Sequence, residues 1–480
     1  MKNRAVPPVI VWFRQDLRLG DHPALTQAAD FPIIPLFIWD EDDPNNPGRA
    51  SRWWLNKSLI SLKKSLDTYG LKLVLRRGNP LKILEEMVIS HNVSTLYWNR
   101  CYEPYTIARD EKIKAFFNSR VECKSFNAFL LVEPWTLKTQ AGKPYKVYTH
   151  YWNAIKSLGS FPQPLPIPKS LKGYEEPLYS DTLESWDLHP LNPDWSQGLE
   201  KEWSPGEEGA KKRLILFLDY LIQTYQNDRN RPHLEATSKL SPHLHWGEIS
   251  PRQIWHSTLT SKLGEPCNDT WTFLSEIAWR EFSYYLLYHF PTLPNKSLRK
   301  EFRQFPWVKD KAALHKWQRG ITGYPIVDAG MRQLWHTGWM HNRVRMIAAS
   351  FLVKDLLIDW QKGAAWFWDT LVDADLASNS ASWQWVAGCG ADAAPYFRIF
   401  NPVIQGQKFD SQGEYVRHWV SELRFLPDKY IHNPWEAPAS VLDSAGIKLG
   451  DTYPLPLVDH KRARVRALEA FKIISTLSKE

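Results

Sequence analysis

The sequence predicts an α/β domain followed by an all-α domain, and three observations lead to this fold class. Residues 9–126 alternate short apolar runs with amphipathic runs, which is the pattern of parallel strands connected by helices. From Gly206 onward, apolar residues recur with the 3.6-residue period of α-helices. Between these parts, residues 159–206 are proline-rich and irregular, as is typical of an extended connector. The predicted domains are a doubly wound parallel-sheet (Rossmann-like) domain over 1–130, a connector over 131–206 and a helical domain over 207–480.

The predicted sheet has its strands separated by helices. The strands are expected at Val9–Phe13, Ile33–Trp39, Leu71–Arg76, Val93–Trp98 and Val121–Phe126. The helices between them are expected at residues 22–29, 51–69, 80–91 and 105–119. Pro80 suits the first turn of a helix, and Gly70 suits the end of one. No GxGxxG motif follows the first strand, so a dinucleotide is not expected at the usual Rossmann position.

The carboxy-terminal part is predicted to be almost entirely helical and contains no internal repeat. Its helices are expected at residues 207–224, 251–260, 269–289, 311–317, 325–337, 339–354, 363–371 and 459–475. The chain contains 25 tryptophans, which is far from ordinary. So many indoles indicate either core and interface packing or an aromatic environment for a cofactor or nucleobases.

Composition limits the class of protein. The chain has 480 residues, of which 23% are charged and 43% hydrophobic, as in folded soluble proteins. Its net charge of +8 permits a polyanionic partner, although many basic proteins bind no nucleic acid. The four cysteines are far apart and form no CxxC, so neither a disulfide framework nor a zinc site is expected. The sequence shows no signal peptide and no bilayer-spanning apolar run, which predicts a cytoplasmic protein that does not enter a membrane.

Residues 366–402 concentrate side chains suited to a flat, polar ligand. Asp373, Asp375 and Asn379 offer groups for ring nitrogens and sugar hydroxyls. Trp383 stands among further aromatic residues in a frame of glycine and alanine, where backbone can approach a ligand closely. On spacing alone, a buried aromatic core with a few satisfied polar groups is the favoured interpretation.

Two other segments carry groups that bind nucleotides. Thr237, Ser238 and Ser241 precede a helical stretch and suit phosphate, although a capped turn is the commoner use of such residues. Further on, Glu276 and Trp279 share one face of a helix with Arg280, because they are spaced at i, i+3 and i+4. This face can stack a base and bind its edge, or it can form an ordinary Glu–Arg ion pair beside a buried tryptophan.

In amino-acid sequence, these segments resemble the photolyase/cryptochrome family of light-driven flavoproteins. The resemblance runs from about residue 9 to about residue 437. It is carried by VIVWFRQDLRLGDHPAL, TFLSEIAWREF, WMHNRVRM and WQWVAGCGADAAPYFRIFNP, the last of which looks most similar to the class III cyclobutane photolyases. The resemblance implies an amino-terminal domain that often carries an antenna chromophore, and a helical domain that holds non-covalent FAD.

The resemblance assigns residues to FAD binding. Asn379 would face the reactive nitrogen of the flavin, where plant-type cryptochromes usually carry an aspartate. An asparagine cannot change charge, which suits the fully reduced anionic flavin that repair requires. Phe273 stands where a well-known bacterial branch has tryptophan. The residues implied to bind FAD are Tyr225, Thr237, Ser238, Leu240, Ser241, Phe273, Arg280, Asn342, Arg345, Asp373, Asp375 and Asn379.

The resemblance also implies a DNA lesion pocket and an electron relay. Glu276 would bond the lesion bases and Trp279 would stack on them. The residues implied to contact DNA or the lesion are Arg229, Glu276, Trp279, Arg280, Asn342, Arg343, Met346, Trp385 and Arg398. The tryptophans implied to re-reduce the flavin are Trp307, Trp360 and Trp383, which join Glu276 and Asn379 as the implied catalytic residues.

The implied reaction is blue-light-driven splitting of cyclobutane pyrimidine dimers in DNA, a carbon–carbon lyase reaction. Reduced FAD would pass one electron to a flipped-out dimer and take it back after the ring opens. The branch that repairs six-four photoproducts carries a histidine pair near the residues that follow His341. Here Asn342 follows His341, and neither Arg345 nor Met346 is histidine, which favours a reaction that needs an electron more than a general acid.

Two alternatives remain at this stage. A cryptochrome photoreceptor would share the fold and the flavin; Asn379 and the lack of a long tail after the last predicted helix oppose it. The second alternative is a basic helical module that binds nucleic acid and has no cofactor. The antenna is left open between methenyltetrahydrofolate and a deazaflavin, because Thr106 stands where folate-binding relatives have a carboxylate. The expected partner is UV-damaged DNA, bound by a monomer.

Overall fold

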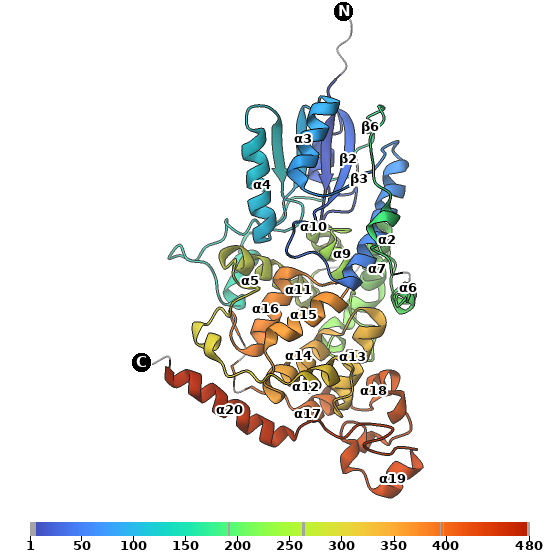
Figure 1. The fold of residues 1–480 in the computed structure, drawn as a ribbon, viewed down its shortest axis with the longest axis vertical. Helices are drawn as coiled ribbons and strands as arrows, with labels where there is room; N and C mark the ends of the chain where they lie inside the picture. The colour runs from blue at the N-terminus through green and yellow to red at the C-terminus, as the bar shows by residue number, and fades with distance from the viewer. Residues whose placement is uncertain (1–5, 191–192, 262–264, 394, 397, 478–480) are drawn as a thin grey trace, which may run out of the picture. The chain divides into compact units, whose positions relative to one another are not determined.

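The computed structural model describes residues 6–190, 193–261, 265–393, 395–396 and 398–477 (Figure 1). The chain divides into two compact units. The first unit comprises Met1–Gln223 with Ser238–Pro291, and the second comprises Thr224–Thr237 with Thr292–Glu480. This division is not the one expected near residue 206, so the predicted domain limits stay predictions. None of the helices within the described ranges is long and apolar enough to cross a membrane.

The first unit contains the predicted parallel sheet. Its main strands are β1 (Val9–Phe13), β2 (Pro32–Trp39), β3 (Val74–Arg77), β4 (Thr95–Asn99) and β5 (Glu122–Phe126). They pair in the order β3-β2-β1-β4-β5, with Val9 opposite Ile33 on one side and Thr95 on the other. The chain therefore leaves β1 toward one edge and returns to its other side, which confirms a doubly wound sheet.

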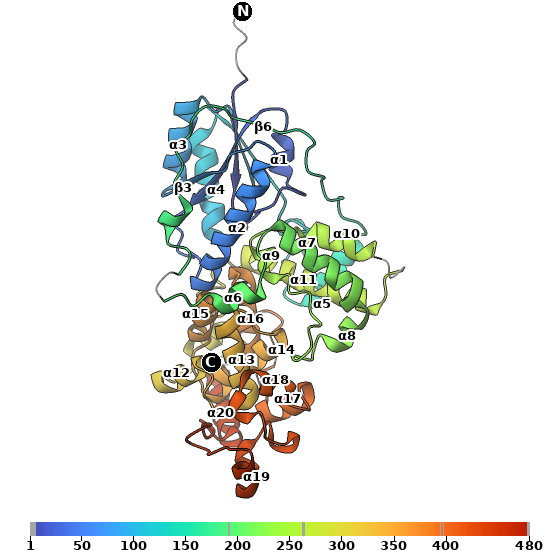
Figure 2. The same ribbon diagram turned by 90° about the vertical axis from the view of Figure 1, so that its right-hand side faces the viewer.

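Helices cover both faces of this sheet. They are α1 (Pro23–Gln27), α2 (Arg49–Asp67), α3 (Pro80–His91) and α4 (Pro104–Phe117). The expected start of α3 is confirmed, because Asn79 accepts from the Lys82 amide and Pro80 follows it. Apolar residues of α3 and α4 pack on Ile10 and Trp12 of β1. Figure 2 shows α1 and α2 on the opposite side of the strands.

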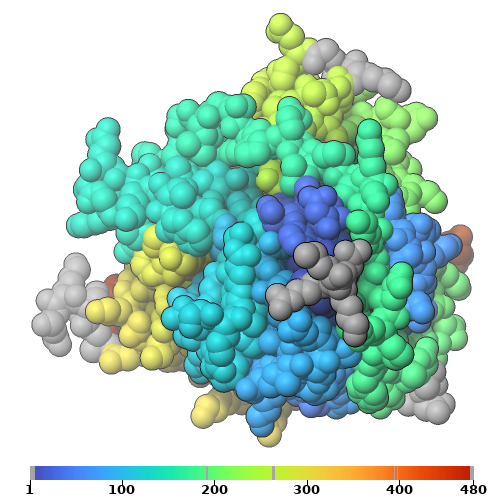
Figure 3. Space-filling model, turned by 90° about the horizontal axis from the view of Figure 1, so that it is seen from above, coloured from blue at the N-terminus to red at the C-terminus, as the bar shows by residue number. Residues whose placement is uncertain are grey.

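The connector is less irregular than its proline content predicts. It contains α5 (Tyr148–Ser157), a 3-10 turn at Leu183–Trp186, α6 (Gln197–Glu202) and the short strand β6 (Lys172–Gly173). β6 pairs with the first two residues of β2, which β3 does not reach because its pairing begins at Leu36. Figure 3 shows the connector, in green, lying along the blue sheet domain. The proline-rich segment thus acts as an edge of the sheet.

The remaining helices of the first unit follow the connector. They are α7 (Glu207–Leu216), which continues as a π-helix at Phe217–Leu221 and a 3-10 turn at Ile222–Thr224, then α9 (Ser241–His245), α10 (Pro251–Leu259) and α11 (Asn268–His289). The predicted helix over 207–224 is therefore helical throughout but not uniformly α. Ser250 and Gln253 form a capping box that fixes the start of α10.

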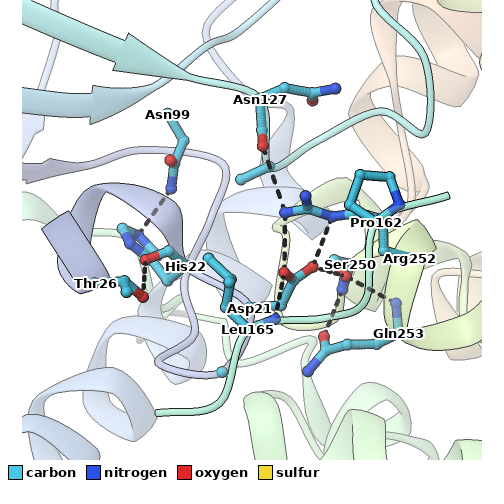
Figure 4. Close-up of polar contacts among 12 residues, drawn as sticks. Asp21, His22, Thr26, Asn99, Asn127, Pro162, Leu165, Ser250, Arg252 and Gln253 are labelled. Carbon is cyan, nitrogen blue, oxygen red and sulfur yellow. Dashed lines mark hydrogen bonds and ion pairs between the residues drawn. The ribbon is translucent and has the colours of Figure 1, made fainter. Parts of the chain in front are cut away.

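A buried carboxylate ties α10 to the sheet domain. Asp21, in the loop after β1, is fully buried, and its side chain accepts from the Ser250 hydroxyl at 2.5 Å and Arg252 Nε at 3.1 Å. It also accepts from the backbone N–H of Leu165 in the connector at 3.0 Å. Figure 4 shows these bonds converging on Asp21. One side chain thus joins three segments that are far apart in the sequence.

The second unit is helical. It contains α8 (Tyr225–Asp228), α12 (Lys311–Gln318), α13 (Pro325–Thr337), α14 (Asn342–Ser350), α15 (Trp360–Thr370), α16 (Leu376–Ala387), α17 (Pro402–Phe409), α18 (Glu414–Trp419), α19 (Ala439–Ser444) and α20 (His460–Leu477). The helix predicted at 339–354 begins later, because His341 caps it, and it continues as a π-helix at Phe351–Asp355. Five of these helices, α8, α16, α17, α18 and α19, were not predicted.

Candidate functional site

In the second unit, α14 and the start of α16 carry an ordered polar group. Arg345 donates to Asp373 Oδ2 at 2.8 Å and to the Met340 carbonyl at 2.7 Å. Asp375 caps α16 by accepting from the Ser378 amide at 2.7 Å. Because Asp373 and Asp375 are both buried, these contacts fix their orientation. Three predicted cofactor residues thus lie on α14 and at the start of α16, and Arg345 and Asp373 are bonded to each other.

Asn379 lies one turn into α16 and has a defined amide orientation. Its Nδ2 donates to the carbonyl of Ala364 in α15 at 3.1 Å. This bond turns the carbonyl oxygen of the side chain away from the Ala364 carbonyl, so that Oδ1 can accept a hydrogen bond from a ligand N–H. Asn379 is half-buried, as a residue at the wall of a ligand site is expected to be.

The three tryptophans predicted to form an electron relay belong to one apolar core. Trp383 is 2% exposed and contacts Phe367, with ring centroids 5.0 Å apart. Trp360, the first residue of α15, is also 2% exposed. Trp307 is only partly buried and packs on Phe305 with ring centroids 4.3 Å apart. Of these three indoles, two are therefore enclosed and one is partly exposed.

A basic, aromatic pocket of about 550 Å³ opens on the second unit. Arg343 lies 4.6 Å over the Phe409 ring and donates to Asn230 at 2.5 Å. The residues that line the pocket are Asn230, Arg343, Arg398, Ile399, Phe400, Asn401, Ile404, Gln405, Lys408 and Phe409. The lining carries three cationic side chains and no acid, which suits an anionic ligand with flat rings.

This pocket brings together two predicted DNA residues and several that sequence reasoning missed. Arg343 and Arg398, which are 55 positions apart in the sequence, line it together. Lys408 and Phe409 were not predicted, although a cation beside an aromatic residue in the helix capped by Asn401 was a usable signal. Phe409 contacts two of the three cations, because Lys408 Nζ lies 5.3 Å from its ring and Arg343 lies over the same ring.

Next to Arg343, the first two turns of α14 carry two further residues predicted to contact DNA. Other predicted DNA residues lie elsewhere in the second unit. Asn342 is exposed and Met346 is half-buried, with its sulfur 3.8 Å from Arg343 Nη1. Trp385 of α16 is partly buried against the core of the same unit. Arg229 follows α8 and lies 5.3 Å over the ring of Tyr225, which is buried. Each of these residues belongs to the second unit, as does the half-buried Thr237.

His341 is held as a neutral base. It is 2% exposed, and its Nδ1 accepts from the Arg343 backbone N–H at 3.2 Å. Burial, followed by the charges of Arg343 and Arg345, lowers the pKa of His341 to about 3. At neutral pH the imidazole therefore carries no proton that it can donate as a general acid.

In the first unit, α11 carries the predicted lesion residues. Glu276 and Trp279 are half-buried, and Trp279 is stacked on Tyr148. Arg280 of the same helix donates through its Nη1 to the Phe129 carbonyl at 2.9 Å, and its guanidinium lies 4.2 Å over the Phe129 ring. The expected grouping of Glu276, Trp279 and Arg280 on one face of α11 stays a prediction, and Phe129 holds the Arg280 guanidinium.

The predicted phosphate residues of the first unit surround the start of α9. Ser238 accepts from Leu240 N through its hydroxyl at 3.4 Å and from Arg213 Nε through its carbonyl at 3.0 Å. Leu240 is buried and Ser241 is exposed. Further along the chain, Phe273 of α11 is buried with its ring 4.5 Å from Phe217. Arg213 is a cation beside the predicted phosphate residues that sequence reasoning did not identify.

The polar residues after β4 are bonded within the protein. Asn99 donates to Asp16 at 2.7 Å, and Arg100 pairs with Glu133 at 2.6 Å. Thr106, the position compared with folate-binding relatives, donates to the Glu103 carbonyl at 2.9 Å. These contacts do not select an antenna, so its identity stays open.

Glu281 gives the first unit a measurable pH dependence. It is 1% exposed, and burial raises the pKa of its carboxyl from 4.5 to about 7, although Arg280 and the N–H groups of Val132 and Leu131 act in the opposite direction. The folded state therefore binds more protons than the unfolded state between pH 4.5 and 7. We expect the free energy of unfolding of the native protein to fall as the pH rises through this window, by about 3 kcal/mol at most. Glu281→Gln is expected to lack this decrease.

Urea unfolding at about pH 5 and about pH 7.5 tests this prediction. The stability of Glu281→Gln relative to the native protein is expected to rise with pH. A difference between the two proteins that stays constant across the window would contradict the assignment.

The chain is similar over nearly its whole length to known photolyases. Residues 9–169 match a family described as DNA photolyase, and residues 273–473 match the FAD binding domain of DNA photolyase. The chain is 49% identical over 470 residues to the deoxyribodipyrimidine photo-lyase of Agrobacterium fabrum, covering 97% of this chain and 98% of that one. It is 39% identical over 481 residues to cryptochrome-1 of Arabidopsis thaliana, covering 96% of this chain and 70% of the relative. Its structure matches that of a bacterial class III photolyase from Agrobacterium tumefaciens with a TM-score of 0.96 at 48% identity, covering 99% and 100% of the two chains.

Proposed function

Because the chain belongs to the photolyase/cryptochrome family, we propose that it is a light-driven enzyme that repairs cyclobutane pyrimidine dimers in DNA. The observation that carries this proposal is its 49% identity, over nearly the full length of both chains, to a deoxyribodipyrimidine photo-lyase. Its match to a solved class III photolyase at a TM-score of 0.96 supports the same class.

The residues of the second unit fit FAD. When bound, reduced FAD supplies the electron that opens the cyclobutane ring and takes it back. Asn379 offers Oδ1 as an acceptor, which matches the N–H that a fully reduced flavin carries at its reactive nitrogen. The Arg345–Asp373 pair adds a cation and an anion from the same unit, and Asp375 is fixed at the start of α16. These residues would hold and orient the cofactor.

The pocket around Arg343 supports DNA as the partner. Arg343, Arg398 and Lys408 would attract phosphates with a salt-dependent, sequence-independent affinity. Phe409 offers a ring against which a base or a guanidinium can stack. Glu276 would accept hydrogen bonds from the edge of a flipped-out base, and Trp279 would stack on it.

The side chains that follow His341 favour the cyclobutane lesion over the six-four photoproduct. Repair of the six-four product moves an oxygen and needs a proton donor, whereas Asn342, Arg345 and Met346 are not histidines and burial lowers the pKa of His341 to about 3. We therefore expect no recovery of six-four products under conditions that restore cyclobutane dimers.

Illumination of the purified protein tests the proposal directly. Reduced protein is mixed with an oligonucleotide carrying one thymine dimer and exposed to blue light, and the recovery of intact thymines is measured by chromatography. The dark reaction and an oligonucleotide with a six-four product serve as controls. Light-dependent recovery from the cyclobutane substrate alone is expected. A flavin-containing protein without recovery would favour the cryptochrome alternative, to which the 39% identity with cryptochrome-1 lends some support.

Replacing Trp307 with phenylalanine is expected to slow photoreduction of oxidised FAD by about tenfold or more. Trp307 is the least buried of the three relay residues, so it is the one placed to receive electrons from solvent donors. Repair by protein that has been chemically reduced beforehand is expected to stay unchanged. Absorbance changes under blue light measure photoreduction, and Trp335→Phe is a control at an exposed tryptophan outside the relay. Loss of repair by the pre-reduced variant would contradict the relay role.

The remaining parts of the proposal concern the assembly and the second chromophore. We propose that the enzyme acts as a monomer in the cytoplasm and carries an antenna that is either methenyltetrahydrofolate or a deazaflavin. Light scattering after size exclusion measures the assembly. The absorption spectrum of chromophores released by denaturation identifies FAD and the antenna together.

A further inference from the structure

Tyr148 lies flat against Trp279 in the first unit. Their ring centroids are 3.7 Å apart and their planes differ by 9°. Tyr148 is the first residue of α5, and its hydroxyl donates to the carbonyl of Ser275 in α11 at 2.6 Å. Ser275 precedes Trp279 by about one helical turn. The phenol is therefore fixed to the helix through its hydroxyl and to the indole through its face.

The two rings differ in their exposure to solvent. Tyr148 is 7% exposed, whereas Trp279 is half-buried. The edge of Phe282 contacts both rings, with centroids 5.8 Å from Tyr148 and 5.9 Å from Trp279. An indole has two faces, and a parallel ring at 3.7 Å occupies one of them. A base that stacks on Trp279 must therefore use the other face.

We propose that Tyr148 is a positioning residue that fixes the tilt of Trp279 and restricts lesion stacking to one indole face. This inference rests on the proposed function, in which Trp279 stacks on the lesion. A pyrimidine dimer is two fused rings at a fixed angle, so it can stack well only on a partner plane of fixed orientation. Undamaged DNA, whose bases stay stacked in the helix, does not need this plane.

The test compares Tyr148→Met, which removes the stack, with Tyr148→Phe, which keeps it. Affinity is measured in the dark for an oligonucleotide with one thymine dimer and for its undamaged counterpart. Tyr148→Met is expected to bind the damaged strand about tenfold more weakly and the undamaged strand within about twofold of the native protein. Repair at saturating substrate is expected to change little, because the residue does not contact the reacting atoms. Tyr148→Phe is expected to recover most of the affinity.

Tyr151→Met is the matched control. Tyr151 is a more deeply buried aromatic residue of the same helix, and its ring contacts Tyr145, Phe282 and Tyr285. It is expected to lower stability without changing the preference for damaged DNA. An equal loss of preference in Tyr151→Met, or native preference in Tyr148→Met, would overturn the inference. If Tyr148→Met does not fold, a normal preference in Tyr148→Phe supports the inference and a lost preference overturns it. A native protein that does not prefer damaged DNA would instead overturn the proposed function.

Discussion

Repair by a Glu276→Ala protein is expected to fall by about 10- to 100-fold in kcat/KM. The carboxylate would accept hydrogen bonds from the edge of the flipped-out pyrimidines, and a hydrogen bond to a charged group contributes about 1.5–3 kcal/mol. Glu276 is half-buried on α11, so its removal leaves no large cavity in the core. FAD content, measured by absorbance, is expected to stay near that of the native protein.

Two further variants make this prediction specific. Glu276→Gln keeps the shape and one acceptor and is expected to retain part of the activity. Asp269→Asn removes an acid from the first turn of the same helix and is expected to repair normally. A Glu276→Ala protein that loses flavin in proportion to repair would show that Glu276 serves the cofactor and not the lesion.

Gly363→Ala is expected to destabilise the second unit by about 2–3 kcal/mol, although alanine is the better helix former. A Cβ at this position in α15 would collide with the ring of Trp383 and lie 2.7 Å from Leu352 Cδ2. Propensity alone would predict a gain of about 1 kcal/mol, so the sign of the effect decides between the two explanations. The collision would also displace Trp383 and slow photoreduction.

Thermal and urea unfolding measure the stability of this variant. Ala365→Ser changes an exposed position of the same helix and is expected to have almost no effect. A stabilised Gly363→Ala protein would show that α15 can move away from α16, in contradiction to the close approach of the two helices.

The sequence was sufficient to predict the strands of the sheet and most of the helices. The strand at Val9–Phe13 was predicted with its observed bounds, because a continuous apolar run between turn signals marks a buried parallel strand. α16 escaped prediction because its serines, alanines and asparagine show no helical period, although Asp375 was an available capping signal. β6 could not be predicted, because two residues become a strand only when an edge is open beside them.

The candidate site was predictable by resemblance and only partly by pattern. Side chains within one helix, such as Asn342 and Arg345, could be grouped from spacing. The pocket that joins Arg343 to Lys408 depends on how distant segments pack, and no local periodicity carries that information. Arg280 shows a second limit, because spacing groups it with Glu276 but does not reveal its bond to the carbonyl of Phe129.

The carboxylate of Asp21 has a consequence for dissecting this protein. A fragment ending near residue 130 would keep Asp21 in the loop after β1 but would lack Arg252, Ser250 and the Leu165 amide. Without these partners, the loop after β1 would lose the charge-assisted hydrogen bonds that hold it in place. The sheet is therefore expected to melt together with α10 in one cooperative transition, and an isolated amino-terminal fragment is expected to be a poor folder.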